Sequence, residues 1–273
     1  MTEGSSADDA VVVSVIMPTY NNEAHIGAAI ESVQSQTRAE WELIVVNDCS
    51  TDGTADVVES YASEDARIRL ITLASNMGAP AGPRNVGVEA ARGTYIALLD
   101  ADDLWHPQKL DLQLNAIRTT GARFVSAGLI DFDDGELPEF SYVRRARLQR
   151  ISMLRTLINT KTPTSTVLAE RALFLRYPFN ESLEYKARED LDCFLHMHEE
   201  IGESIKVLHP LLGYRITAGQ QISGNKLTML KRHYHVLSRY EWSSGRPMGT
   251  LAALFTASHF ASALYHRAWR GRM

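Results

Sequence analysis

The chain has little cysteine: Cys49 and Cys193 lie far apart and lack the spacing of a metal-binding motif. This excludes a disulfide framework, and two free thiols in a reducing cytoplasm are expected. The sequence also lacks a run of the roughly 20 apolar residues that a membrane-spanning helix needs. Residues 1–10, MTEGSSADDA, are acidic and polar, unlike a secretory signal, and we expect them to form a disordered tail.

Basic side chains are scarce in the first part of the chain. Residues 1–110 carry 17 acidic and 6 basic side chains, a balance of −11. Because a nucleic-acid backbone needs a basic footprint on the protein, we expect no nucleic-acid partner. The acidic character suits a site that holds an anionic ligand through a metal ion. Residues 226–273 have the opposite character, with 8 basic side chains and 1 acidic one.

Strand-like and helix-like segments alternate along the first 130 residues. Apolar strand patterns occur at 11–18, 41–46, 67–73, 93–99 and 122–130. Helical patterns separate them, at 23–36, 51–62, from the Gly/Pro-rich turn at 78–83 to about 91, and at 106–120. This alternation predicts an α/β fold with βαβ units, in which a mixed, mostly parallel sheet has helices on both faces.

The pattern is less regular after residue 130. An acidic loop at 131–140 is followed by a basic run at 144–150, which we interpret as a solvated face. Helices are expected near 151–158, 169–175 and 189–201, and an extended segment at 204–216. Two further helical stretches, at about 226–242 and 247–269, predict a C-terminal helical extension.

Polar side chains follow four consecutive strands of the predicted sheet. They lie in PTYNN (18–22), in NDCSTDGT (47–54), at Asn76, and in the acidic turn LLDADD (98–103). Because open α/β sheets bind ligands at the carboxyl ends of their strands, this edge predicts a ligand crevice. Taken alone, Asp52 could cap a helix and Asn76 could serve a turn.

The types of these side chains suggest a nucleotide. Asp100 and Asp102, one residue apart, can share a divalent cation that also binds a diphosphate. Asp48 can accept an imide N–H from a uracil-like base, and Asp100 can accept hydrogen bonds from ribose hydroxyls. Arg84 could lie near the phosphates or pair with a neighbouring aspartate, and the sequence leaves both open.

Four segments carry a resemblance to a known family: VSVIMPTYNNEAHIGAAIESVQSQT (13–37), ELIVVNDCSTDGT (42–54), NMGAPAGPRNVGVEAARGTYIALLDADDLWHPQKLDLQ (76–113) and KARED (186–190). Through them the sequence closely resembles the inverting family 2 glycosyltransferases, which have the Rossmann-like GT-A nucleotide-sugar fold. The resemblance implies a GT-A domain over 11–225, with a nucleotide-sugar half at 11–115 and an acceptor half at 116–225. The helical extension at 226–273 follows it.

The resemblance also implies roles for individual residues. The implied donor site consists of Pro18, Thr19, Tyr20, Asn22, Asp48, Asp52, Asn76, Arg84, Asn85, Asp100 and Ala101. Asp102 would bind the metal ion, Mn²⁺ or Mg²⁺. Glu189 and Asp190 match the family's catalytic acidic pair, in which the aspartate is the general base that takes a proton from the acceptor hydroxyl. Without the resemblance, a helix cap would explain this pair.

One position departs from the family pattern. After Tyr214 and Arg215 the family often has a histidine two residues on, where this chain has Thr217, and then a serine, here Ser223. The metal or phosphate contact that this histidine would make is therefore not expected from Thr217 in this chain.

The resemblance implies a metal-dependent, inverting transferase that moves a sugar from a nucleotide diphosphate, UDP being favoured, to a hydroxyl of a glycan or lipid-linked acceptor in surface polysaccharide synthesis. A sugar nucleotidyltransferase is one alternative, although the first turn, PTYNN, lacks a glycine-rich triphosphate loop. A non-catalytic nucleotide-sugar binding module is another, and it would not need Asp190. A glycoside hydrolase is less favoured, because that chemistry usually needs no nucleotide pocket.

The basic C-terminus has two interpretations. Residues 251–273 combine apolar residues at helical spacing with a terminal cluster of Arg267, Arg270 and Arg272. The segment could pack on the domain or on a second subunit, which would make the protein a homodimer. It could instead attach peripherally to the anionic inner face of the membrane, where a lipid-linked acceptor is found.

Overall fold

The computed structural model describes residues 11–158, 162–216 and 226–270. Its strands are β1 (Val13–Thr19), β2 (Trp41–Asn47), β3 (Ile68–Thr72), β4 (Tyr95–Leu98), β5 (Leu104–Trp105), β6 (Phe124–Phe132), β7 (Leu148–Ser152), β8 (Leu168–Glu170) and β9 (Glu203–Arg215). Its α-helices are α1 (Glu23–Gln34), α2 (Thr54–Glu64), α3 (Ala81–Ala90), α4 (Lys109–Thr120), α5 (Met153–Ile158), α6 (Arg171–Arg176), α7 (Glu189–Ile201), α8 (Lys226–Arg239) and α9 (Leu251–Arg270). Short 3₁₀ turns occur at Thr164–Thr166 and Leu183–Tyr185.

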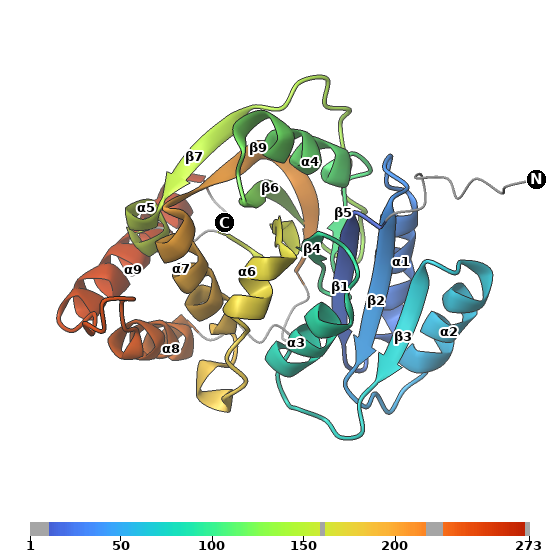
Figure 1. Ribbon diagram of the computed structural model, residues 1–273, viewed down its shortest axis with the longest axis horizontal. Coiled ribbons are helices and arrows are strands. Elements are labelled where there is room, and N and C mark those ends of the chain that lie inside the picture. Colours follow the sequence, from blue (N-terminus) through green and yellow to red (C-terminus); the bar gives the residue numbers. More distant parts are fainter. Residues whose placement is uncertain (1–10, 159–161, 217–225, 271–273) are drawn as a thin grey trace, which may run out of the picture.

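The described strands form one mixed sheet in the order β3-β2-β1-β4-β8-β6-β9-β5, and β7 pairs with β9 outside this path (Figure 1). The first four strands in this order are parallel to one another, whereas β8 is antiparallel to both β4 and β6. The predicted α/β class and mostly parallel sheet are therefore confirmed. The carboxyl ends of β1 to β4 lie along one edge, as the site hypothesis requires.

Alternating side chains of the central strand β1 face two different hydrophobic cores. Val15 belongs to the core that includes Ile26 and Ile30 of α1, whereas its neighbour Ile16 packs with Val88 of α3. The second core extends to α6 and α7 on the same face of the sheet. Because both faces of β1 are covered, the strand is apolar at nearly every position, as its sequence suggested.

The two C-terminal helices pack beside α7 rather than on the sheet. Leu191 and Leu195 of α7 form a third core with Val236 and Leu237 of α8 and with Ala252 of α9. Figure 1 shows α8 and α9 at the end of the molecule farthest from α2. This arrangement confirms the predicted C-terminal helices, while the domain boundaries remain a prediction.

The second half contains strands that the sequence analysis did not predict. β7 occupies part of the basic run at 144–150, which we had interpreted as a solvated face, and it pairs with β9 from Leu148↔Val207 to Ser152↔Glu203. It is an edge strand with alternating exposed and half-buried residues, so its sequence is not apolar enough to predict a strand. β8 precedes the helix that we expected near 169–175, which is present as α6 from Arg171 to Arg176, and the three residues of β8 are too few to show a period.

Cys49 and Cys193 are free thiols, as expected. Among the described residues, no helix has the combined length and hydropathy that crossing a membrane requires.

Candidate active site

The carboxyl ends of β1 and β2 are linked through Asp48. Its N–H donates to the Thr19 carbonyl at 2.8 Å, and its Oδ1 accepts from the Met77 N–H at 2.7 Å. Asn76 Nδ2 donates to the Asp48 carbonyl at 2.7 Å, which brings the segment after β3 to the same edge. The predicted grouping of Thr19, Asp48 and Asn76 is therefore present in the structure.

Asp52 organises the starts of two helices beside this edge. Its Oδ1 accepts from the N–H and hydroxyl of Thr54, and its Oδ2 accepts from the Glu23 N–H at 3.2 Å. The Asn22 N–H donates to the Thr54 hydroxyl at 2.8 Å. Tyr20 is half exposed at 51%, so its ring is accessible to a ligand. Pro18 lies within β1 opposite Val46, and contacts of these residues with a donor remain a prediction.

The acidic turn after β4 is held from two sides. The Asp100 N–H donates to the Ser165 hydroxyl at 3.0 Å, from the 3₁₀ turn before β8. At the end of β9, the Arg215 N–H donates to Asp103 Oδ1 at 3.1 Å, and Arg215 Nε donates to the Asp102 carbonyl at 2.8 Å. Burial and the neighbouring Asp100 carboxylate raise the pKa of Asp102 to about 6. Ala101 is buried in the core, which fixes the turn between its two carboxylates.

Arg84 connects this turn to helix α7. Its two terminal nitrogens contact Asp100 at 2.7 Å and Glu189 at 2.8 Å. The Arg84 and Glu189 side chains are only 4% and 5% exposed, so the pair is buried. Burial raises the pKa of Glu189, and the Arg84 charge opposes that increase. Of the two placements that the sequence left open for Arg84, the structure shows pairing with carboxylates.

Asp190 lies in the first turn of α7, next to Glu189. Its Oδ1 accepts from the Leu191 N–H at 2.8 Å, and its Oδ2 accepts from the Thr164 hydroxyl at 3.3 Å. Thr164 and Ser165 are consecutive, so one short turn contacts both Asp190 and the backbone of Asp100. Two independent connections, Arg84 and this turn, therefore bring the motifs at 98–103 and 186–190 together.

Asn85 forms a different kind of contact. Its Nδ2 donates to the Phe179 carbonyl at 2.9 Å and to Glu181 at 2.8 Å, and its Oδ1 accepts from the Phe179 N–H. It thereby ties the segment before α7 to α3. Lys186 has a similar effect, since its Nζ donates to the Gly78 carbonyl at 2.6 Å. Any contact of Asn85 with a donor remains a prediction.

Sequence reasoning missed three residues that shape this site. Thr164 and Ser165 stood out only as part of the polar segment TPTST, and Arg215 only as a member of the family's tyrosine–arginine pair. Nothing in their local pattern shows that they contact the acidic turn and Asp190, because these contacts depend on how β8 and β9 enter the sheet. Thr217 and Ser223 lie outside the described residues.

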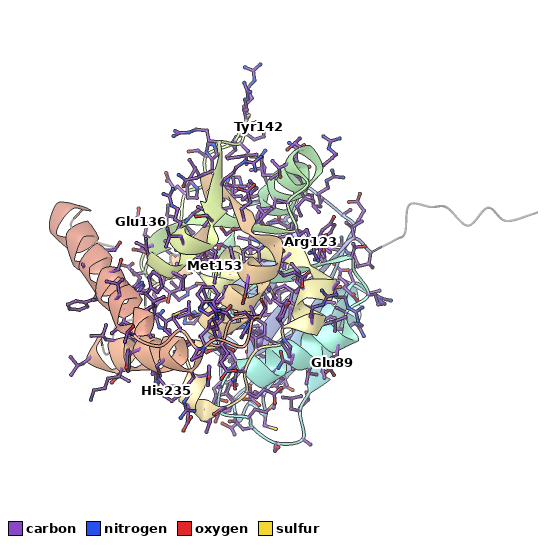
Figure 2. All side chains as sticks on the ribbon, turned by 60° about the vertical axis from the view of Figure 1, so that its left-hand side comes forward. Glu89, Arg123, Glu136, Tyr142, Met153 and His235 are labelled. Atoms are coloured by element: carbon purple, nitrogen blue, oxygen red, sulfur yellow. The ribbon has the colours of Figure 1, made fainter. Side chains whose placement is uncertain are left out.

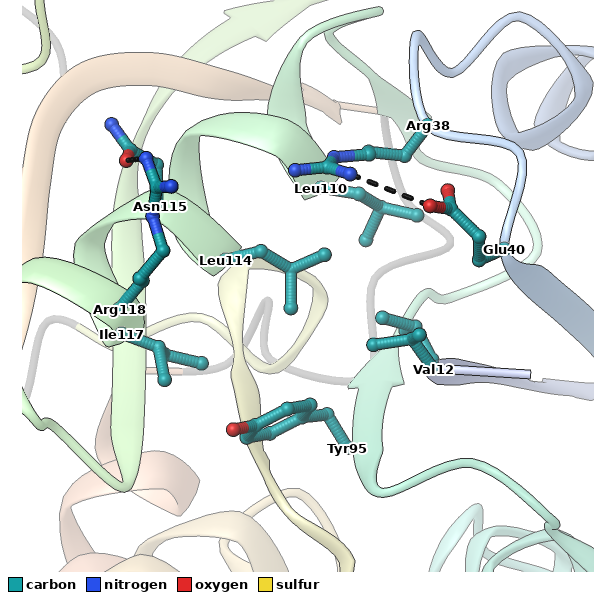
Figure 3. A pocket seen from close by; sticks show the side chains of 10 residues that line it. Val12, Arg38, Glu40, Tyr95, Leu110, Leu114, Asn115, Ile117 and Arg118 are labelled. Carbon is teal, nitrogen blue, oxygen red and sulfur yellow. Dashed lines mark hydrogen bonds and ion pairs between the residues drawn. The ribbon is translucent and has the colours of Figure 1, made fainter. Parts of the chain in front are cut away.

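A hollow of about 350 Å³ lies at the opposite edge of the sheet (Figure 3). Its lining includes Val12 and Tyr95, near the starts of β1 and β4, and apolar residues of α4. Arg38 and Glu40 at this hollow pair with each other at 3.4 Å. Because the acidic turn follows the other end of β4, this hollow is not part of the candidate active site.

The acidic turn fits a divalent metal ion by its chemistry. Carboxylate oxygens are the ligands that Mg²⁺ and Mn²⁺ prefer, and Mg²⁺ usually takes one or two protein carboxylates and completes its shell with substrate phosphates and water. Asp102 is partly buried beside Asp100, so a cation there would relieve the repulsion that raises its pKa. In the part of the chain that the structure describes, no group of three or more acidic, histidine or cysteine side chains forms a metal cage.

Comparisons with known proteins agree with this geometry. The family model for glycosyl transferase family 2 matches residues 14–183. The putative teichuronic acid biosynthesis glycosyltransferase TuaG of Bacillus subtilis (strain 168) is 32% identical over 232 residues, covering 84% of this chain and 88% of that protein. The chain belongs to glycosyltransferase family 2. It is therefore a glycosyltransferase, and the resemblance seen in the sequence is confirmed.

Another relative of this glycosyltransferase is the UDP-Glc:alpha-D-GlcNAc-diphosphoundecaprenol beta-1,3-glucosyltransferase WfgD of Escherichia coli, 33% identical over 85% of this chain and 87% of that protein. Among solved structures, S. aureus TarS in complex with UDP superposes with a TM-score of 0.66 at 20% identity, covering 94% of this chain and 72% of that chain. The mannosyltransferase PcManGT of Pyrobaculum calidifontis, in complex with GDP-Man and Mn²⁺, gives a TM-score of 0.57 at 17% identity over 94% and 75% of the two chains. These structures show that the fold is GT-A.

Proposed function

We propose that this glycosyltransferase moves a sugar from a UDP-sugar to a hydroxyl of a lipid-linked glycan, with inversion at the anomeric carbon, in surface polysaccharide synthesis. The main support is the joining of the acidic turn to the start of α7 through Arg84 and through Thr164–Ser165. A carboxylate pair suited to a nucleotide diphosphate and a carboxylate suited to proton abstraction thus belong to one site.

Asp48 supports a uracil base in the donor. It is buried at the carboxyl end of β2, and only its Oδ1 has a partner among the described residues, the Met77 N–H. Its Oδ2 can therefore accept the imide N–H of uracil. WfgD is named for a UDP-glucose donor, and TarS was solved with UDP, which agrees with this choice.

Asp102, beside Asp100, would hold Mn²⁺ or Mg²⁺. When bound, such an ion acts as a Lewis acid that stabilises the charge of the departing diphosphate. Asp100 is held by Arg84 and by Ser165, so its carboxylate has a fixed direction from which it can accept ribose hydroxyls. The start of α3 offers no free basic side chain to the phosphates, since Arg84 is already paired twice.

Asp190 is the proposed general base, and Glu189 is the second member of the acidic pair beside it. The Glu189 carboxylate is committed to Arg84, whereas Asp190 accepts only from Thr164 and from the start of its own helix among the described residues. The positive end of the α7 dipole favours an ionised carboxylate in the first turn. Asp190 can then take the proton of the acceptor hydroxyl as that oxygen attacks the anomeric carbon.

The acceptor assignment follows from the relatives. WfgD is named for a GlcNAc-diphosphoundecaprenol acceptor, and TuaG for teichuronic acid biosynthesis. We extend the shared chemistry, a lipid-linked or growing surface glycan, to this protein.

The first test is a thermal-shift screen of UDP- and GDP-sugars, each with Mn²⁺ and with EDTA. A ligand that binds the native state raises its stability according to the ratio of ligand concentration to dissociation constant. We expect one UDP-sugar to raise the melting temperature, and only with Mn²⁺ or Mg²⁺. The best donor is then incubated with a lipid-linked glycan, UDP release is measured, and the anomeric configuration of the product is determined by NMR.

Two variants separate the proposed roles. Asp190→Asn should lower kcat by about 10²–10⁴-fold, the usual contribution of general base catalysis, and leave UDP-sugar binding nearly unchanged. Asp102→Ala should abolish both transfer and the metal-dependent part of donor binding. Full activity of Asp190→Asn would remove the base assignment. Pyrophosphate release from UTP would instead support a nucleotidyltransferase, and donor binding without turnover on any acceptor would support a binding module.

A further inference from the structure

Helix α9 exposes an apolar face. Its exposed residues over 251–261 are Leu251, Ala253, Leu254, Ala257, Phe260 and Ala261, and none of them is polar. Leu254 is 61% exposed and Phe260 is 42% exposed. Surface helices normally direct polar side chains to water, so a helix whose exposed residues are all apolar is expected to be covered there as well. The opposite face of α9 is already covered, because Ala252 belongs to the core that α8 and α9 share with α7.

Exposed cations without ion pairs occur on the neighbouring helix α8 and on the connection between α8 and α9. Lys231 of α8 and Arg246, between α8 and α9, are exposed, and Arg232 is half exposed. Among the described residues, none of these three has a carboxylate within ion-pair distance, whereas Arg239 of the same helix pairs with Glu184. Residues 226–273 carry 8 basic side chains and 1 acidic one. Figure 2 shows α8 and α9 along the outer margin of the molecule, accessible to a large surface.

We propose that α8 and α9 form a docking face for an anionic lipid bilayer, with Leu254 and Phe260 inserted among the lipid chains and with Lys231 and Arg246 at the headgroups. A second copy of this chain is a poorer occupant. Residues 226–273 of each copy carry 8 basic side chains and 1 acidic one, and this like charge disfavours the approach of two copies through α9. A helix pair that carries both exposed apolar residues and exposed cations has the chemistry of interfacial membrane binding.

The docking face extends the proposed function without depending on it. α8 and α9 pack on α7, and the proposed base lies in the first turn of α7, so one helix joins the docking face to the site. Membrane docking would therefore hold the site at a fixed position relative to the bilayer in which a lipid-linked acceptor is anchored.

Vesicle co-sedimentation of the full chain tests the proposal. We expect binding to phosphatidylglycerol–phosphatidylcholine vesicles that weakens with salt, and little binding to phosphatidylcholine alone. Leu254→Gln/Phe260→Gln should weaken binding about tenfold or more, since both side chains lose apolar insertion. Lys231→Gln and Arg246→Gln should each weaken it about fivefold, the usual effect of one cation at an anionic surface.

Matched controls lie elsewhere on the surface. Leu137→Gln changes a leucine that is 69% exposed, and Arg144→Gln changes an exposed arginine that forms no ion pair among the described residues; neither should alter vesicle binding. All variants should transfer sugar to a water-soluble acceptor at the wild-type rate, so failure of docking and failure of the enzyme activity are distinguishable. Equal pelleting of wild type and Leu254→Gln/Phe260→Gln would overturn the proposal. So would a concentration-dependent dimer that this variant abolishes, without vesicle binding by the wild type.

Discussion

Replacement of Arg84 by methionine tests the connection between the two halves of the site most directly. The guanidinium is buried and contacts both Asp100 and Glu189. Methionine retains much of the length of the side chain and removes the charge. Glu189 is then a buried carboxylate without a cation, while Asp100, whose side chain is 35% exposed, can be hydrated.

The magnitude follows from the burial of the pair. Removing one partner of a buried ion pair costs about 3–5 kcal/mol, because the remaining charge is uncompensated. We expect Arg84→Met to lower the free energy of unfolding by about 3–4 kcal/mol, since Asp100 contributes less than a fully buried carboxylate. For a chain of this size, that corresponds to a melting temperature lower by about 6–16 °C.

A double-mutant cycle measured by urea unfolding isolates the pair. Replacing both partners of a buried ion pair by apolar residues is often nearly neutral, so Arg84→Met/Glu189→Leu should recover most of the stability that Arg84→Met loses. Arg38→Met is the matched control. Its pairs with Glu40 and Asp111 are exposed, and its loss should stay below about 1 kcal/mol.

The pH dependence of Arg84→Met provides a second measurement. Burial raises the pKa of Glu189 above its unfolded value, and Arg84 no longer opposes the increase. The folded variant therefore binds more protons than the unfolded chain, so its stability deficit grows as pH rises from the unfolded pKa and shrinks toward pH 4.5. A deficit below about 1 kcal/mol at pH 7, or strictly additive effects in the cycle, would refute the reasoning.

Two further predictions concern stability alone. Burial, together with His259 and Arg188, lowers the pKa of His233 from 6.5 to about 2. Below pH 6.5 the unfolded chain takes up a proton that the folded protein does not, so this histidine should cost the wild type about 1.4 kcal/mol of stability per pH unit. The urea midpoint of His233→Phe should lack this contribution, and equal slopes for the two proteins would contradict the prediction. In Gly87→Ala the new Cβ would lie 2.4 Å from Ile16 Cγ2, so α3 must shift, and calorimetry should show a destabilisation of about 1–3 kcal/mol. The control Ala90→Gly, in the last turn of the same helix, should lower the free energy of unfolding by at most about 1 kcal/mol.

The first half of the fold could be predicted from the sequence because its strands are covered on both faces. β1 and β2 are buried at all seven positions each, and such mostly apolar runs are easily recognised. The helices between them present one apolar stripe to the sheet, as at Ile26, Ala29, Ile30 and Val33 of α1. Boundaries accordingly agree within about three residues.

The second half was less predictable because its strands are short or lie at an edge. β8 has three residues and therefore shows no period, as is also true of the two-residue β5 in the first half. β7 is exposed on one side, and its pairing with β9 is set by tertiary contacts rather than by its own composition. By contrast, α7 was predicted with its observed bounds, because its acidic first turn and apolar stripe are both local signals.

The candidate site shows the same division. Asp48 and Asp100 follow predicted strands, and the predicted fold alone was enough to place them at one edge of the sheet. The partners that hold the acidic turn, Ser165 and Arg215, come from the turn before β8 and from the end of β9, and the sequence did not reveal how β8 and β9 enter the sheet. Local patterns therefore identified the chemical groups of the site, whereas long-range pairing determines what fixes their geometry.

Arg215 is the partner whose role is easiest to separate from folding. Its Nε donates to the Asp102 carbonyl, its N–H donates to Asp103, and its guanidinium pairs with Asp134, so it orients the turn that carries the proposed metal ligand.

Arg215→Lys keeps the charge and the backbone contact but loses the fork of N–H donors. Loss of such an outer contact typically weakens metal binding about 10–100-fold. We therefore expect the Mn²⁺ concentration for half-maximal UDP-sugar binding to rise by that factor, with kcat at saturating metal changed much less. Asp134→Asn, which keeps an oxygen acceptor on an exposed side chain, is the control and should have a smaller effect. A fall in kcat at saturating Mn²⁺ with an unchanged metal requirement would contradict the positioning role.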